Sequence, residues 1–330
     1  MKKIGVNGFG RIGRCLVRLC LEQGDFEVAV VNDLADLETL AHLFKYDSVH
    51  GVLNQGVSVV ENRLRFDDGR EIHFVQEADP AKIKWSDYGV ELVVECTGRF
   101  LTRETASAHL NGSVRKVVLS APAKDPSIRT VVLGVNDDQI EADDQIISNA
   151  SCTTNSAAPL VKVIRELANI KNAYITTIHS YTSDQRLHDA PHRDLRRARA
   201  AANSIVPTTT GAAKALWKIF PELEGHMGGC GVRVPVPDGS LTDLTLMVDR
   251  ELEVDAINAA FKQAAEGDLK GILRYTEDPI VSVDIIDDSH SSVFDAQLTS
   301  VIGHMVKIVG WYDNEWGYSN RLVDLVRKLI

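Results

Sequence analysis

The sequence predicts an α/β protein of two domains, on the evidence of its length and of a change in strand pattern partway along the chain. Its 330 residues exceed what one ordinary hydrophobic core holds. Apolar strand-like runs alternate with helix-like runs over residues 1–149, as in a doubly wound parallel sheet. Within 150–314, many strand-like runs alternate polar and apolar residues, which indicates an α+β domain with a mainly antiparallel sheet.

The N-terminal strand and helix enclose a glycine-rich turn. The predicted strand Lys3–Val6 is followed by the pattern G-x-G-x-x-G, formed by Gly8, Gly10 and Gly13, and then by apolar residues at helical spacing. In this context Gly8 permits a tight turn, Gly10 lets the backbone approach a pyrophosphate, and Gly13 allows close packing of helix and strand. The first domain is therefore predicted to be a Rossmann-like dinucleotide-binding domain.

An acidic residue follows the second predicted strand, Glu27–Val31. Asp33 lies 20 residues after Gly13, the spacing expected of a carboxylate that binds ribose hydroxyls. A carboxylate there repels a 2′-phosphate, so Asp33 favours NAD over NADP. The alternative role for Asp33 is a turn or a helix cap.

Later runs predict the remaining elements of the first domain. They are strands at Glu91–Glu95, Val117–Leu119, Thr130–Leu133 and Ile146–Ile147, and a helix at Arg103–Leu110. Thr97-Gly98 and Ser120-Ala121-Pro122 each follow a strand, at the carboxyl edge where open α/β sheets bind ligands. Ordinary turn chemistry would also place such residues there.

Cys152 is the candidate nucleophile. It lies in the polar turn Asn149–Asn155, just before the helix-like run Ala157–Ala168. A helix N-terminus presents unpaired N–H groups and a partial positive charge, which favour a thiolate and are expected to lower the thiol pKa. The alternative is that Cys152 is a small buried apolar residue.

The second domain supplies a candidate base. His179 ends a strand-like run, 27 residues after Cys152, so a strand could bring the imidazole beside the thiol. A Cys–His pair provides a nucleophile and a general base. Strands of the second domain are predicted at Ala173–Ile178, Leu244–Val248, Ile280–Ile286 and Met305–Trp311.

The end of the chain has the apolar spacing of a helix. We expect residues 315–330 to form a helix that returns to pack on the first domain.

Hydroxyl and guanidinium groups follow His179, in a combination suited to binding phosphate. They occur in Ser180–Asp184, in the segment 186–199 with its five arginines, in Thr208–Gly211 and at Arg233. Five arginines exceed the needs of one small ligand. At least one of Arg196, Arg197 and Arg199 is therefore expected on a solvated or intersubunit face.

Composition excludes several other classes of protein. The net charge of −10 argues against a general nucleic-acid or membrane binder. The five cysteines are scattered and no histidine cluster has metal-ligand spacing, so we predict neither a disulfide framework nor a metal site. No apolar run is long enough to span a bilayer, and the N-terminus leaves no room for a signal peptide before the first strand, so we expect a cytoplasmic location.

Five motifs in this order closely resemble the phosphorylating glyceraldehyde-3-phosphate dehydrogenase family, over essentially the whole chain. They are Asn7–Gly13, Ser148–Asn155, His179–Thr182, Thr208–Ala213 and Trp311–Ser319. The resemblance implies NAD as cofactor, glyceraldehyde 3-phosphate and inorganic phosphate as substrates, and a homotetramer.

The resemblance also implies roles for individual residues. Cys152 would be the nucleophile and His179 its base. The residues that would contact NAD, beside the glycines and Thr97 already described, are Arg11, Ile12, Asp33, Ser120 and Asn314. One phosphate position would use Thr182 and Arg233, another Ser151, Thr153, Thr210 and Gly211, with Arg197 also facing the phosphates.

Three positions depart from the usual family pattern. Ser156 stands where many members have a second cysteine, Ala78 replaces a commoner basic residue, and Ala190 is also met in members that accept NADP. Two alternatives stay open at this point. One is erythrose-4-phosphate dehydrogenase, a related enzyme that usually hydrolyses its thioester, and the other is a catalytically silent NAD-binding scaffold.

Overall fold

The computed structural model describes all 330 residues, which divide into two compact units. Unit 1 contains Met1–Val131, Gln139–Ala150 and Ser319–Ile330, and unit 2 contains Val132–Asp138 and Ser151–Tyr318. The boundary between Ala150 and Ser151 therefore falls immediately before the segment of Cys152. None of the helices has the length and apolar character needed to cross a membrane.

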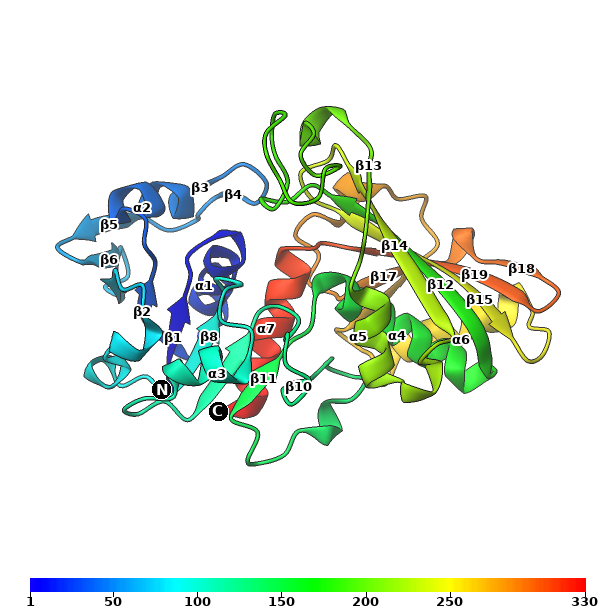
Figure 1. Ribbon diagram of the computed structural model, residues 1–330, viewed down its shortest axis with the longest axis horizontal. Coiled ribbons are helices and arrows are strands. Elements are labelled where there is room, and N and C mark those ends of the chain that lie inside the picture. Colours follow the sequence, from blue (N-terminus) through cyan, green and yellow to red (C-terminus); the bar gives the residue numbers. More distant parts are fainter. The chain divides into compact units, whose positions relative to one another are not determined.

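Unit 1 is built on a nine-stranded sheet, drawn in blue to green in Figure 1. Its strands are β1 (Lys3–Asn7), β2 (Glu27–Asn32), β5 (Val57–Val60), β6 (Arg63–Phe66), β7 (Glu71–Val75), β8 (Leu92–Glu95), β9 (Lys116–Leu119), β10 (Arg129–Thr130) and β11 (Ile146–Ser148). A separate hairpin pairs β3 (Tyr46–Asp47) with β4 (Gly51–Val52). The α-helices are α1 (Arg11–Gln23), α2 (Leu37–Lys45), α3 (Arg103–Ala106) and, from Ser319 onward, α7 (Trp316–Leu329).

The strand order of this sheet is β10-β11-β9-β8-β1-β2-β7-β6-β5. Every pair from β10 to β7 is parallel, and only β6 and β5 add antiparallel edge strands. The central strands are apolar and almost fully buried, as strands covered on both faces must be. The predicted doubly wound parallel sheet is confirmed.

The glycine-rich turn joins β1 to α1 as predicted. Glycine is suited to its three positions for different physical reasons. Gly8 has φ +99°, which side chains disfavour. A Cβ on Gly13 would lie 2.1 Å from the Gly8 carbonyl oxygen, so only glycine permits this packing of helix on turn. A Cβ on Gly10 would meet no atom within 4 Å. The backbone at Gly10 is therefore open to an approaching ligand.

Unit 2 is built on an eight-stranded mixed sheet, drawn in green to orange in Figure 1. Its strands are β12 (Ile170–Ser180), β13 (Val206–Thr208), β14 (Met227–Val234), β15 (Ser240–Val248), β16 (Leu273–Thr276), β17 (Ser292–Asp295), β18 (Ser300–Ile302) and β19 (Met305–Tyr312). Its helices are α4 (Cys152–Leu167), α5 (Ala212–Ile219) and α6 (Val254–Glu266). Short 3-10 helices in the two units are Pro80–Lys82, Trp85–Tyr88, Ser107–His109, Asp137–Gln139, Ala201–Asn203, Pro221–Leu223, Ser282–Ile285 and Ala296–Leu298.

The order β13-β14-β12-β15-β19-β17-β16 is mainly antiparallel, with β18 beside β19. The β12–β14 and β16–β17 pairs are parallel. Along β12, Ile175 is buried, whereas its neighbour Tyr174 is 50% exposed. The alternation of the sequence thus corresponds to one covered and one open face, and the α+β prediction is confirmed.

One predicted strand of unit 2 is wrong. The segment 280–286 forms the 3-10 helix Ser282–Ile285 in place of a strand. The Asp284 carboxylate accepts a hydrogen bond of 2.8 Å from the backbone N–H of Val281, and this local bond competes with strand pairing. Val281 and Val283 remain more than half exposed, so their apolar character did not indicate a core strand.

Gly13→Ala is expected to lower the free energy of unfolding by about 3 kcal/mol, because its Cβ overlaps the Gly8 carbonyl oxygen. Urea unfolding followed by circular dichroism measures the change. Gly10→Ala is the matched control, since its Cβ enters open space at φ −73°. Equal stability of the two variants would contradict the packing argument.

Candidate active site

Cys152 is the first residue of α4, as predicted. Ser151 precedes it as the N-cap, and its hydroxyl accepts a hydrogen bond of 3.1 Å from the Thr154 N–H. Ala150 has φ +55°, an uncommon conformation for a residue with a side chain. The turn that presents Cys152 is therefore fixed by the Ser151 cap and by the left-handed backbone conformation of Ala150.

His179 is the penultimate residue of β12, which is hydrogen-bonded to β14 on one side and β15 on the other. Its Nε2 lies 3.5 Å from the Cys152 Sγ. The predicted pair is thus brought together, with the imidazole buried and the thiol half-buried. A proton can pass directly between these two atoms.

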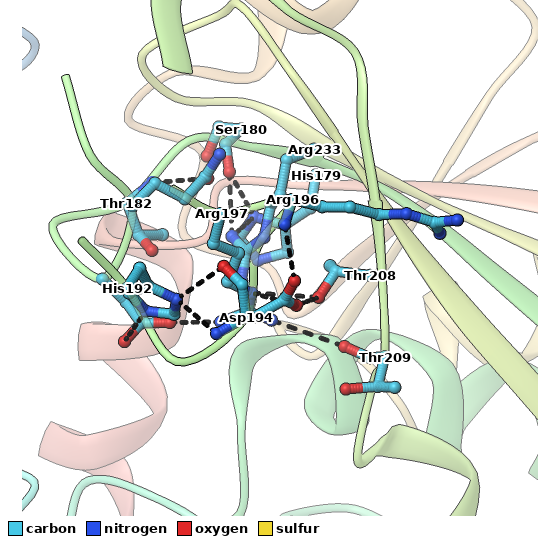
Figure 2. Close-up of polar contacts among 12 residues, drawn as sticks. His179, Ser180, Thr182, His192, Asp194, Arg196, Arg197, Thr208, Thr209 and Arg233 are labelled. Carbon is cyan, nitrogen blue, oxygen red and sulfur yellow. Dashed lines mark hydrogen bonds and ion pairs between the residues drawn. The ribbon is translucent and has the colours of Figure 1, made fainter. Parts of the chain in front are cut away.

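Arg233 of β14 lies opposite His179 in the parallel β12–β14 register. Its Nη1 is 2.7 Å from the His179 Nδ1 and donates to the Ser180 carbonyl oxygen at 2.9 Å. Figure 2 shows these three residues converging at the end of the strand.

The His179 Nδ1 therefore has two neighbours of opposite kind. Besides the Arg233 donor, it lies 2.8 Å from the Ser180 carbonyl, an acceptor. With hydrogen on Nδ1, the ring donates to Ser180 and leaves Nε2 free to accept from the thiol. With hydrogen on Nε2, Arg233 donates to Nδ1 and the ring donates toward Sγ. The site can hold either tautomer.

The electrostatics differ from the sequence-based expectation. Burial raises the pKa of the Cys152 thiol to about 11, outweighing the Arg233 charge and the Thr153 N–H, which lower it. Burial, followed by the Arg233 charge, lowers the pKa of His179 to about 3. The expected fall in the thiol pKa is thus wrong for this state, because desolvation exceeds the helix N-terminal effect. Near pH 7 the pair is a neutral thiol and a neutral imidazole.

Tyr312 is a site residue whose role the sequence did not reveal. Its hydroxyl lies 2.9 Å from the Thr153 and Thr177 hydroxyls, and its ring meets the His179 ring edge-on at 5.9 Å. The only sequence indication was its position inside the Trp311–Ser319 motif. The Tyr312 hydroxyl thus holds the Thr153 and Thr177 side chains beside the Cys152–His179 pair.

Two more of the predicted phosphate-binding residues, Thr182 and Arg197, are drawn near His179 and Arg233 in Figure 2. Arg197 Nε donates to the Thr208 hydroxyl at 2.9 Å, and its guanidinium pairs with Asp184. Its positive charge acts on both His179 and Arg233, lowering the pKa of each. Arg197 thus points into the site.

Two further predicted residues lie at the start of α5. Gly211 is its N-cap, and the Thr210 hydroxyl accepts a hydrogen bond from the Ala212 N–H at 3.2 Å. Thr182 follows β12, half-buried, with its N–H donating to Gln185 at 3.3 Å. By contrast, Arg199 pairs with Asp189 on the surface, as expected for at least one arginine of this segment.

Asn314 is buried and held by Ser180, which the sequence grouped with the candidate phosphate-binding hydroxyls, and by Ser240, which it did not single out. Its Oδ1 accepts from the hydroxyls of Ser180, at 2.8 Å, and Ser240, at 2.6 Å. Both hydroxyls fix the carbonyl side of the amide, so the amide NH2 is the group left to face a ligand. The departure Ser156 is also buried, and its hydroxyl bonds to those of Thr242 and Ser292.

In unit 1 the predicted cofactor residues lie at the carboxyl ends of the parallel strands. Asp33 follows β2, and its carboxylate accepts from the Phe9 N–H at 2.7 Å and from the Ala35 N–H at 3.0 Å. It is thus both a turn residue and an anchor of the glycine-rich turn. Thr97 follows β8 and Ser120 follows β9.

The start of α1 carries the last two predicted cofactor residues. Arg11 is the first residue of the helix and pairs with Asp47 at 2.6 Å, and Ile12 is half-buried beside it. Together with the open backbone at Gly10, the carboxyl edge of this sheet fits a dinucleotide, whose phosphates a helix N-terminus attracts.

Comparison with known proteins agrees with this geometry. Two family models match the chain: the glyceraldehyde 3-phosphate dehydrogenase NAD binding domain over residues 2–103 and the glyceraldehyde 3-phosphate dehydrogenase C-terminal domain over residues 151–314. Glyceraldehyde-3-phosphate dehydrogenase 1 of Bacillus cereus is 56% identical over 327 residues, covering 98% of this chain and 97% of that protein.

Two further relatives are similar over the same extent. Glyceraldehyde-3-phosphate dehydrogenase of Streptomyces coelicolor is 55% identical over 327 residues, covering 98% of this chain and 97% of that protein. The protein of the same name from Geobacillus stearothermophilus is 54% identical over 325 residues, covering 98% of this chain and 96% of that protein.

Arg233→Gln is expected to raise the pKa of Cys152, because the variant removes a cation that stabilises the thiolate. At any one pH below that pKa, less thiolate is present and alkylation by iodoacetamide is slower. The measurement is the pH profile of the alkylation rate without cofactor. Arg199→Gln, at an exposed ion pair, is the control and should leave the profile unchanged. An unchanged or lowered midpoint in Arg233→Gln would refute the role assigned to its charge.

Proposed function

The chain belongs to the glyceraldehyde-3-phosphate dehydrogenase family, and from this premise we propose that it converts D-glyceraldehyde 3-phosphate and inorganic phosphate to 1,3-bisphosphoglycerate while reducing NAD. The observation that carries the chemistry is the 3.5 Å contact between Cys152 Sγ and His179 Nε2, with Arg233 behind the imidazole. Such a reaction serves glycolysis or gluconeogenesis, since a catalyst accelerates both directions.

NAD is the cofactor of this oxidoreductase. When bound, it accepts the hydride that leaves the aldehyde carbon. We propose that it is held by Gly8, Gly10, Arg11, Ile12, Gly13, Asp33, Thr97, Ser120 and Asn314. The Asp33 carboxylate favours it over NADP, since a 2′-phosphate would meet a negative charge.

Cys152 and His179 carry the covalent chemistry in this proposal. The thiol proton passes to His179 Nε2 as Sγ forms a bond to the aldehyde carbon, and the new oxyanion takes that proton back, giving a thiohemiacetal. The His179 Nε2–H and the Cys152 backbone N–H are placed to stabilise the oxyanion. When the carbon is oxidised, His179 removes the hydroxyl proton and a thioester remains.

Inorganic phosphate then attacks the thioester carbon and the C–S bond breaks. An acyl phosphate leaves, and the protonated His179 returns its proton to the Cys152 thiolate. We assign Thr182 and Arg233 to one phosphate position, and to the other Ser151, Thr153, Thr210 and Gly211. Arg197 faces both substrates' phosphates. Two helix N-termini and two buried or half-buried guanidinium groups support this assignment.

We further propose residues 1–149, with the helix 315–330, as the NAD-binding domain and 150–314 as the catalytic domain. The family relationship supports a homotetramer and a cytoplasmic location, both of which stay predictions. Sedimentation of the purified enzyme measures the first.

The deciding assay is NADH formation from glyceraldehyde 3-phosphate and NAD, with and without inorganic phosphate. Strong phosphate dependence is expected, because phosphate resolves the thioester. Comparable turnover without phosphate would favour the hydrolytic chemistry of erythrose-4-phosphate dehydrogenase. No turnover with either aldehyde phosphate, while NAD still binds, would favour a silent scaffold.

Two substitutions test the residue roles. Cys152→Ser should reduce kcat by about 10⁴-fold or more while NAD binding persists, because the nucleophile is lost. His179→Asn should reduce kcat by about 10²-fold to 10⁴-fold, the usual contribution of a general base. Stopped-flow NADH absorbance and NAD titration measure both, and near-native turnover in either variant would defeat the mechanism.

A further inference from the structure

Glu95, the last residue of β8, is a fully buried carboxylate that the mechanism above does not use. A buried carboxylate is costly unless its oxygens accept hydrogen bonds. Glu95 has four such donors. They are Asn7 Nδ2 at 2.5 Å, the Thr97 N–H at 2.7 Å, the Thr97 hydroxyl, and His109 Nε2 at 3.0 Å.

Three of these four donors, one from Asn7 and two from Thr97, lie beside the two turns that the proposed function assigns to NAD. Asn7 is the residue before the glycine-rich turn, and Thr97 begins the turn after β8. The two turns also touch: a Cβ on Gly8 would lie 2.8 Å from the Thr97 nitrogen and 2.9 Å from the Cys96 carbonyl carbon. Glu95 thus hydrogen-bonds to both turns across this narrow contact, in addition to the backbone bond of 2.7 Å from the Cys96 N–H to the Asn7 carbonyl.

The hydrogen bonds continue from Asn7 to the ribose-binding edge. Asn32 Nδ2 donates to Asn7 Oδ1 at 2.6 Å, and Asn32 also bonds through its amide to the backbone of Glu77, at 2.8 and 2.9 Å. Its carbonyl accepts the Gly8 N–H at 2.7 Å. The next residue is Asp33, so the network reaches the candidate ribose ligand.

His109 supports Glu95 from the side away from these turns. Its ring is fully buried between Trp85 and Phe100, at centroid distances of 5.8 and 5.9 Å. Its Nδ1 has no hydrogen-bond partner, so the contact with Glu95 is its one polar interaction. The orientation of the imidazole is thus set by two aromatic rings and by one hydrogen bond, to Glu95.

We propose that Glu95 and His109 are positioning residues for the cofactor: Glu95 holds the Asn7–Gly8 and Thr97–Gly98 turns at the separation that NAD requires, and His109 fixes the Glu95 carboxylate. Neither residue touches the reacting atoms. The inference rests on the proposed function to the extent that NAD binds at this edge.

The test compares NAD dissociation constants by fluorescence titration for the full-length enzyme and its variants. Glu95→Gln keeps the shape of the side chain but places a donor NH2 group among four hydrogen-bond donors. We expect it to weaken NAD binding about tenfold. Glu91→Gln is the matched control, because Glu91 precedes the same strand, is exposed, and loses the same charge. It should bind NAD as the unaltered enzyme does.

A second pair of variants guards against misfolding of Glu95→Gln. His109→Leu removes the imidazole donor and should weaken NAD binding severalfold, whereas His109→Gln restores an N–H donor and should recover part of the loss. In the folded variants of Glu95 and His109, KM for NAD should rise, whereas kcat at saturating NAD should stay nearly constant. The rate of Cys152 alkylation without NAD should equal that of the unaltered enzyme, which a general loss of structure would not preserve.

The inference would be overturned if the NAD dissociation constant of Glu95→Gln lay within twofold of that of the unaltered enzyme. If only His109→Leu folds, the same criterion applies to that variant. A fall in kcat with unchanged KM would overturn it as well. Failure of the unaltered enzyme itself to bind NAD would instead refute the proposed function.

Discussion

The parallel register of β12 and β14 is the constraint on which the chemistry of unit 2 depends. It sets His179 opposite Arg233 and leaves Nε2 of the same ring facing Cys152 at the start of α4. A slip of one residue would turn the imidazole to the other face of the sheet. Both strands are paired along their lengths, so the backbone fixes the distances on which the side chains rely.

Burial then decides the resting state of the site. The same desolvation that raises the thiol pKa lowers the imidazole pKa, and both shifts oppose an ion pair. Arg233 contributes in opposite senses, since its charge favours the thiolate and disfavours the imidazolium. Without ligands, Cys152 is therefore a neutral thiol beside a neutral imidazole near pH 7.

Local patterns predicted the parts of the structure that depend on local chemistry. The glycine-rich turn, the helix beginning at Cys152 and the strand that carries His179 near its end all follow from residues adjacent in sequence. The segment 280–286 was misjudged because the Asp284 side chain satisfied a backbone N–H that a strand would have used.

Other features depend on contacts between distant residues and left little trace in the sequence. Tyr312 joins two threonines that lie 159 and 135 residues away, and Glu95 joins Asn7 across 88 residues. The raised pKa of Cys152 is likewise a property of the packed environment, which no local pattern reports. Periodicity and spacing predict elements, whereas the buried polar networks between them emerge only from the tertiary structure.

The bond from the Phe9 N–H to Asp33 has a consequence for engineering cofactor preference. Admitting a 2′-phosphate calls for removal of the Asp33 charge. The Asp33 Oδ2 atom, however, also anchors the glycine-rich turn by accepting the Phe9 N–H. A replacement by alanine would release the turn together with the charge, whereas asparagine keeps an oxygen acceptor of the same reach. To redesign this enzyme for NADP, the residue that replaces Asp33 should therefore be an uncharged hydrogen-bond acceptor. A small side chain without an acceptor would not hold the turn.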